Sequence, residues 1–63
     1  MMPMTSKEMV KVLENNGFKC IGSNGSHRKY FNKQTNKKTI VPYHNEDLKK
    51  GTEQRILKDA GLK

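Results

Sequence analysis

The side chains best suited to chemistry near neutral pH are the two histidines, because an unperturbed imidazole titrates at about 6.5. His27 precedes Arg28 and Lys29, so its imidazole lies among cations where a phosphodiester would bind. Such a histidine can take the proton from an RNA 2′-hydroxyl or give one to the leaving 5′-oxygen, while the cations neutralise charge on phosphorus. This route needs no metal, and no carboxylate cluster suited to Mg²⁺ is evident. The alternative is a strand histidine that only contacts phosphate or packs on Tyr30.

Three further groups are candidates with less specific roles. His44 follows Tyr43 in a polar loop, where it is a second acid or base, a substrate contact or a structural residue. Ser26 adjoins His27, but neighbouring strand residues point to opposite faces, so phosphate binding or turn formation suits it better than a nucleophilic role. Cys20 is expected to pack as a small apolar residue, since nothing near it indicates an activated thiolate.

The charge balance favours an anionic polymer as the ligand. The 63 residues include 13 Lys and Arg against 6 Asp and Glu, a net charge of +7. Nucleic acid is therefore the first candidate ligand, ahead of an anionic membrane surface or an acidic protein. Residues 26–43 hold five cations and no acid, namely Arg28, Lys29, Lys33, Lys37 and Lys38. A hairpin kept soluble by its lysines is the alternative explanation.

The length excludes a second lobe or a deep substrate cavity. We expect one domain over residues 1–63 with a thin core. The single cysteine excludes an intramolecular disulfide, and with only two histidines it cannot complete a four-ligand zinc site. We therefore expect no metal and no cofactor. No apolar run reaches the length of a signal-peptide core or a membrane span, which predicts a soluble, cytoplasmic protein.

Two amphipathic helices are predicted, one on each side of the basic segment. Residues 5–8, Thr-Ser-Lys-Glu, have the form of a capping box, the apolar stripe of residues 9–13 follows, and Gly17 supplies the stop. Thr52 is expected to cap the second helix, whose apolar stripe lies in residues 56–60. Lys49 and Lys50, just before that cap, are placed to hold a phosphate together with free helix amides.

Three β-rich runs lie between the helices, at residues 18–22, 26–32 and 38–43, with turns at 23–25 and 33–37. Alternation places His27, Lys29 and Phe31 on one face and Arg28 and Tyr30 on the other, without indicating which face meets the helices. The predicted class is α+β, in the order α-β-β-β-α, with both helices on one face of a three-stranded antiparallel sheet. Double-stranded RNA-binding domains share this order.

Four strings occur in order along the chain: Gly25-Ser26-His27, Val41-Pro42-Tyr43-His44, Leu48-Lys49-Lys50-Gly51-Thr52 and Ile56-Leu57-Lys58-Asp59-Ala60-Gly61-Leu62. With Asn16-Gly17-Phe18 after the first helix, they resemble the signature of the HicA toxins over nearly the whole chain. The resemblance implies a small mRNA interferase that inhibits translation and growth and that a HicB-like antitoxin binds and blocks. It assigns catalysis to His27 and maps a second family histidine to His44.

The sequence therefore predicts an endoribonuclease toxin in a hetero-oligomeric complex with its antitoxin, acting on mRNA. The expected phosphate contacts are Ser26, Arg28, Lys29, Lys37, Lys38, Lys49 and Lys50. His44 and Tyr30 are candidates for contacts with the substrate or with the catalytic group. The turn at 33–37 lacks the glycine often found there in the family. The alternative function is a non-catalytic module that binds double-stranded RNA through the same basic surface.

Overall fold

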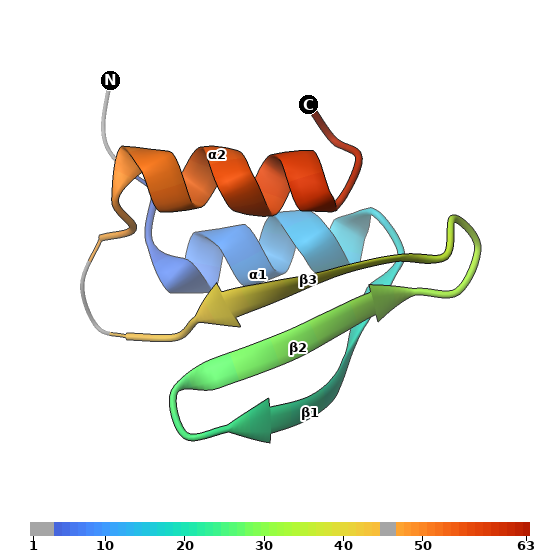
Figure 1. Cartoon of the computed structure of the whole chain (residues 1–63), viewed down its shortest axis with the longest axis horizontal. Helices are drawn as coiled ribbons and strands as arrows, with labels where there is room; N and C mark the ends of the chain where they lie inside the picture. The colour runs from blue at the N-terminus through green and yellow to red at the C-terminus, as the bar shows by residue number, and fades with distance from the viewer. Residues whose placement is uncertain (1–3, 45–46) are drawn as a thin grey trace.

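The computed structural model describes residues 4–44 and 47–63. Within them the chain forms, in order, α1 (Ser6–Asn15), β1 (Phe18–Asn24), β2 (His27–Asn32), β3 (Lys37–Pro42) and α2 (Lys50–Asp59). The strands make one antiparallel sheet in the order β1-β2-β3. Both helices lie on the same side of the sheet, with α2 above α1 in Figure 1. The predicted α+β class and element order are confirmed.

Helix α1 begins and ends as its sequence predicts. The Thr5 side chain accepts a hydrogen bond from the Glu8 amide (3.1 Å), and the Thr5 amide donates to Glu8 Oε1 (3.0 Å), which completes the capping box. The bonds from Thr5 lower the pKa of the exposed Glu8 carboxyl below its usual 4.5. At the other end Gly17 takes a φ of 91°, and a Cβ there would lie 3.3 Å from Asn32 Nδ2.

Helix α2 starts earlier than the sequence predicts. Thr52 is not the N-cap: the helix begins at Lys50, Lys49 occupies the cap position, and no side chain there bonds to the first turn. The cause lies just upstream, where buried Leu48 donates its amide to the Met4 carbonyl (2.8 Å) and so fixes the chain direction before the helix. Ile56 is buried against the core, in agreement with the predicted apolar stripe.

The first hairpin is longer than predicted. A β-bulge at Ile21 shifts the register between Cys20 and Gly22 by one residue. Strand pairing then continues as far as Asn24, which lies opposite His27. The turn is therefore the pair Gly25-Ser26, with Gly25 at a φ of 63°, rather than residues 23–25. Cys20 is exposed on this edge strand, so the prediction that it packs as an apolar residue is wrong.

The core decides which sheet face meets the helices. Tyr30 and its cross-strand partner Thr39 are buried, as are Asn32 and Val41, and these positions share one face. The buried apolar residues are Met9, Leu13, Phe18, Tyr30, Val41, Leu48, Ile56 and Ala60. The opposite face carries His27, Lys29 and Phe31 of β2 and Lys38 and Ile40 of β3. We call it the uncovered face, because neither helix packs on it.

Candidate functional site

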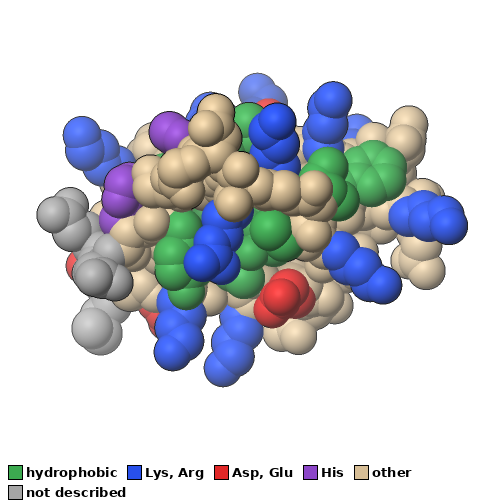
Figure 2. All heavy atoms as spheres, turned by 90° about the horizontal axis from the view of Figure 1, so that it is seen from below, with side chains coloured by type: hydrophobic (Ala, Val, Ile, Leu, Met, Phe, Trp, Pro, Cys, Tyr) green, Lys and Arg blue, Asp and Glu red, His purple; other side chains and the backbone are tan. Residues whose placement is uncertain are grey.

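His27 lies at one end of the sheet. It is the first residue of β2, is exposed, and pairs with Asn24 of β1 and Pro42 of β3. Figure 2 shows both histidine side chains toward the same end of the face it presents, with Lys and Arg side chains spread around that face. A polymer can therefore reach the His27 imidazole from solvent without entering a pocket.

The turn before His27 is held by Tyr43, the residue that follows β3. The Tyr43 amide donates to the Ser26 carbonyl at 2.7 Å. The guanidinium carbon of Arg28 lies 3.8 Å from the centre of the Tyr43 ring, a close cation–π contact. Because Arg28 is half-buried and stacked, the direction of its guanidinium is restricted.

Ser6 ties the same end of the sheet to α1, and the sequence analysis did not identify this role. Its side chain is fully buried; the hydroxyl donates to the Pro42 carbonyl (2.8 Å) and accepts from the His44 amide (3.3 Å). The segment with Tyr43 and His44 is therefore anchored to the first turn of a helix. In the sequence this role is visible only as a serine at the first position of a predicted helix. A serine there does not indicate a hydrogen-bond partner 36 residues away.

His44 and the start of α2 share a surface hollow of about 320 Å³. Its lining includes Ser6, Pro42, His44, Lys49 and Thr52. The hollow adjoins the His27 end of the sheet, because Pro42 is the cross-strand partner of His27. The structure therefore places Lys49 near the His27 end of the sheet, although the helix begins at Lys50 rather than after Thr52; a phosphate contact of Lys49 stays a prediction.

The other predicted phosphate contacts are distributed unequally. Lys29 lies two residues beyond His27 on the uncovered face, whereas Lys37 pairs with Asn32 at the opposite end of β2. His27 and Asn32 are five residue steps apart along β2, a distance of about 17 Å. Lys38 lies beside Lys37, so the structure does not bring these two lysines together with His27.

Tyr30 has no surface for a substrate. It is only 1% exposed, and this burial raises the pKa of its hydroxyl above the usual 10.0, with a smaller opposing effect from Arg28. A direct contact of Tyr30 with the substrate is therefore wrong, whereas its alternative role, a contact with another group of the site, stays a prediction; its hydroxyl interacts with Arg28. Among residues 4–44 and 47–63, no three His, Cys, Asp or Glu side chains gather into a group able to hold a metal.

Within the same ranges, no helix has the length and apolar character that crossing a bilayer requires. A comparison with curated proteins finds no relative of this chain. The family model described as the HicA toxin of bacterial toxin–antitoxin systems matches residues 6–62. That match starts at the first residue of α1 and runs past α2, so it includes His27, its turn and the segment that anchors it. The chain belongs to the HicA toxin family.

Proposed function

We propose that this toxin is an endoribonuclease that cleaves mRNA by metal-independent acid–base catalysis at His27. The observation that supports it best is the placement of one exposed imidazole at the sheet end where Arg28 is held against Tyr43. An exposed site of this kind suits a polymer, because RNA can present its phosphates at the protein surface without entering a deep pocket.

The reaction proceeds by attack of the RNA's own 2′-hydroxyl. The neutral His27 imidazole accepts the 2′-hydroxyl proton as the 2′-oxygen bonds to phosphorus and the bond from phosphorus to the 5′-oxygen breaks. The 5′-oxygen takes up a proton as it leaves, and the products are a 2′,3′-cyclic phosphate and a 5′-hydroxyl. His44, at the same end of the sheet, is the candidate donor for that second proton.

Cations around His27 hold the phosphates. Arg28 and Lys29 come from β2, and Lys49 and Lys50 come from the start of α2. Arg28 and His27 leave the strand on opposite faces, yet both lie at its end, so they can reach one phosphate that sits just past it. Their charge stabilises the additional negative charge of the transition state. A HicB-like antitoxin in the cytoplasm neutralises the toxin by covering this end.

The test compares two exposed histidines, His27→Ala and His44→Ala. We expect His27→Ala to lower the rate of RNA cleavage by about 100-fold or more, with RNA binding retained and with wild-type cleavage unchanged by EDTA. His44→Ala, which removes the candidate proton donor, should also lower the rate, and the control is Lys37→Ala at the opposite end of the sheet, which should cost less than about twofold. Equal cleavage by wild type and His27→Ala would remove the catalytic assignment.

The second candidate function is a non-catalytic module for double-stranded RNA, favoured by the fold alone. In that case wild type leaves RNA intact, and its affinity for RNA falls with salt by a slope that counts the phosphates neutralised. Loss of affinity in the Arg28→Ala variant, with no cleavage by wild type, would support this function over the nuclease.

A further inference from the structure

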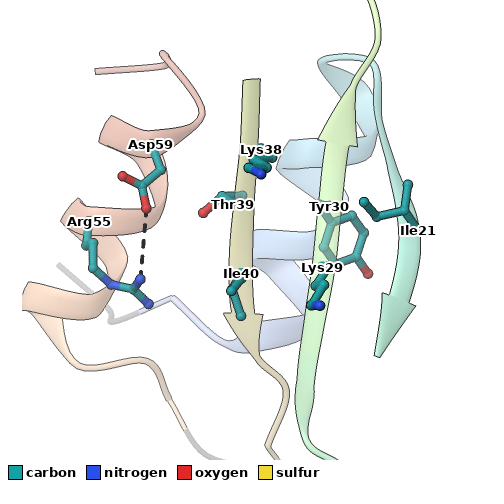
Figure 3. Close-up of a pocket in the computed structure, with 8 residues that line it drawn as sticks. All are labelled: Ile21, Lys29, Tyr30, Lys38, Thr39, Ile40, Arg55 and Asp59. Atoms are coloured by element: carbon teal, nitrogen blue, oxygen red, sulfur yellow. Dashed lines mark ion pairs between the residues drawn. The ribbon is translucent and has the colours of Figure 1, made fainter. Parts of the chain in front are cut away.

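The hydroxyl of Thr39 is buried without a hydrogen-bond partner. Thr39 is 3% exposed, and nothing in the described part of the chain bonds to its Oγ1. A buried polar group in this condition destabilises a fold, and native proteins keep few of them. Figure 3 shows the hydroxyl on the side of β3 that faces α2, where Arg55 and Asp59 lie. Its position therefore favours a ligand that bonds to it from the space between β3 and α2.

Thr39 lines a hollow of about 470 Å³ that extends from the uncovered face to α2. Its floor includes Ile40, which follows Thr39 on β3 and is 40% exposed. Arg55 and Asp59 project from α2 and form the wall beside β3 (Figure 3). A flat group that enters the hollow therefore meets an apolar surface below it and polar groups at its edge. Sites for small ligands have this combination.

The two charged groups of the wall keep their capacity for hydrogen bonds. Arg55 Nη1 lies 3.9 Å from Asp59 Oδ2, whereas a charge-assisted hydrogen bond measures about 2.7–2.9 Å. The two side chains are 54% and 44% exposed, so both can turn toward a ligand. The wall thus presents a guanidinium, which only donates, beside a carboxylate, which only accepts, and the Thr39 hydroxyl below them can do either.

Guanine is the RNA base that matches this set of groups. Its Watson–Crick edge presents adjacent N–H donors at N1 and N2, beside the acceptor O6. The donors match the two oxygens of the Asp59 carboxylate, and O6 matches the Arg55 guanidinium. Adenine and cytosine present an amino group next to an acceptor nitrogen, and uracil has a single N–H between two carbonyls. None of these three can donate two parallel hydrogen bonds to one carboxylate.

The hollow is within reach of an RNA strand bound at His27. Lys29 lines the hollow and is two residues from His27, about 7 Å along β2. Its exposed side chain can hold a phosphate between the imidazole and the hollow. We infer that the hollow binds an unstacked guanine base of the RNA that the toxin cleaves, and so makes cleavage depend on sequence. This inference rests on the proposed nuclease function, and its test separates the two.

The first experiment measures affinity for RNA by fluorescence anisotropy at fixed salt. Every protein carries His27→Ala, so that binding is measured without cleavage. The RNAs are oligouridylates with one central guanosine, adenosine or cytidine, or with none. We expect the guanosine to tighten binding by about tenfold, and the other two bases by less than about threefold. Equal affinity for all four RNAs, or no binding of any, would overturn the subsite.

Two carboxylates of the toxin are then compared as amides. Asp59→Asn replaces one acceptor oxygen by a donor, so the preference for the guanosine RNA should fall below about threefold, although loss of the negative charge favours RNA in general. Glu14→Gln removes the same charge from an exposed side chain of α1 and should keep the full preference. An equal preference in the two variants would rule out the contact with Asp59 and, with it, the subsite.

Thr39→Val separates a ligand contact from a structural role. Valine has nearly the same shape and lacks the unpartnered hydroxyl, so thermal unfolding should occur at or above the wild-type temperature. The preference for the guanosine RNA should nevertheless fall by about threefold, as expected for the loss of one hydrogen bond. A variant that is less stable and keeps the preference would make Thr39 a structural residue, outside the subsite.

The last measurements identify the source of the base and isolate the nuclease. If guanosine monophosphate binds as tightly as the guanosine RNA, the hollow is a site for a free nucleotide and the RNA subsite is overturned. With His27 restored, cleavage of a defined RNA should cluster beside guanosines, and Asp59→Asn should spread it to other bases. Cleavage without regard to guanosine would refute the subsite alone. A preference for guanosine in a toxin that cleaves nothing would refute the nuclease alone.

Discussion

The two ends of the sheet carry similar positive charge but are held in different ways, and α1 spans the distance between them. Its first residue, Ser6, bonds to Pro42 at the His27 end. Just after its last turn, the Asn16 carbonyl accepts from Asn32 Nδ2 (2.8 Å) at the other end. Each end of the sheet is thus tied by one buried polar side chain to one end of the same helix.

The difference lies in what these ties hold. At the His27 end they fix the segment with Tyr43 and, through it, the direction of Arg28. At the other end Asn32 Oδ1 accepts from the Gln34 amide (2.9 Å), so this side chain stabilises the turn between β2 and β3. Lys37 and Lys38, which follow that turn, are exposed. Charge alone therefore does not distinguish the two ends of the sheet; the fixed position of Arg28 near an exposed imidazole does.

The largest difference between the ends should come from removing one cation at each. We expect Arg28→Ala to lower kcat/KM for RNA cleavage by about 10- to 100-fold, which corresponds to about 1.4–2.7 kcal/mol of lost transition-state binding. Lys37→Ala should cost less than about twofold, because an exposed lysine about 17 Å away contributes little beyond general attraction. Initial rates on a defined RNA at fixed salt give both values.

Arg28→Lys separates charge from stacking in this comparison, since lysine keeps the charge but not the planar contact with Tyr43. It should recover only part of the loss. Equal losses in Arg28→Ala and Lys37→Ala would break the comparison, because RNA would then depend on both ends of the sheet. If the protein cleaves no RNA, the same variants can be ranked by RNA affinity.

The two buried ties should give similar losses of stability but different losses of activity. Ser6→Ala leaves the Pro42 carbonyl and the His44 amide without their partner, and Asn32→Ala does the same to the Asn16 carbonyl. Each should lower the free energy of unfolding by about 1–3 kcal/mol, measured by urea denaturation. Only Ser6→Ala should also lower kcat, since it releases the segment beside His27.

Cleavage is compared well below both unfolding midpoints, so that both variants remain folded during the assay. Ser6→Ala should shift the Tyr43 amide NMR signal, which reports the bond to Ser26, whereas Asn32→Ala should leave it in place. Equal activity losses in the two variants, with unmoved Tyr43 signals, would make Ser6 a structural residue only.

Local patterns predicted most of the fold. The capping box and Gly17 correctly predict where α1 begins and ends, because these signals involve residues only three or four positions apart. The alternation of strand residues correctly predicts that His27 and Arg28 lie on opposite faces of the sheet. The bulge at Ile21 was not predicted, because register depends on a partner strand and not on the strand's own sequence. For the same reason the first turn was placed too early.

The candidate site was predicted in its residue types but not in its arrangement. Lys37 and Lys38 are close to His27 in sequence, yet the hairpin carries them to the far end of the sheet. Ser6 and Tyr43, which hold the His27 end, act through bonds across 36 and 17 residues. No short pattern encodes contacts of that span. The missing family glycine in the second turn has a local explanation, because Asn36 takes a φ of 59° there and asparagine tolerates that conformation.

The smallest effect should come from the capping box, and it depends on pH. The pKa of Glu8 is lower in the folded protein than its usual 4.5, so the ionised carboxylate stabilises the fold. That contribution is complete above the unfolded pKa and is lost as pH falls through the folded pKa. Wild type should therefore exceed Glu8→Gln in the free energy of unfolding above about pH 4.5, and the difference should shrink below it.

Urea denaturation at a series of pH values measures this difference, and the Thr5→Ala background should reduce it, since the hydroxyl that bonds to Glu8 is then absent. Because the capping box adjoins Ser6, acid should loosen the His27 end before the other. Hydrogen exchange should then quicken at the Tyr43 amide, which bonds to Ser26, before it does at the Asn36 amide, which bonds to Asn32. Simultaneous loss of protection at both amides would show that α1 transmits the change to both ends, and that the two ends are not held independently.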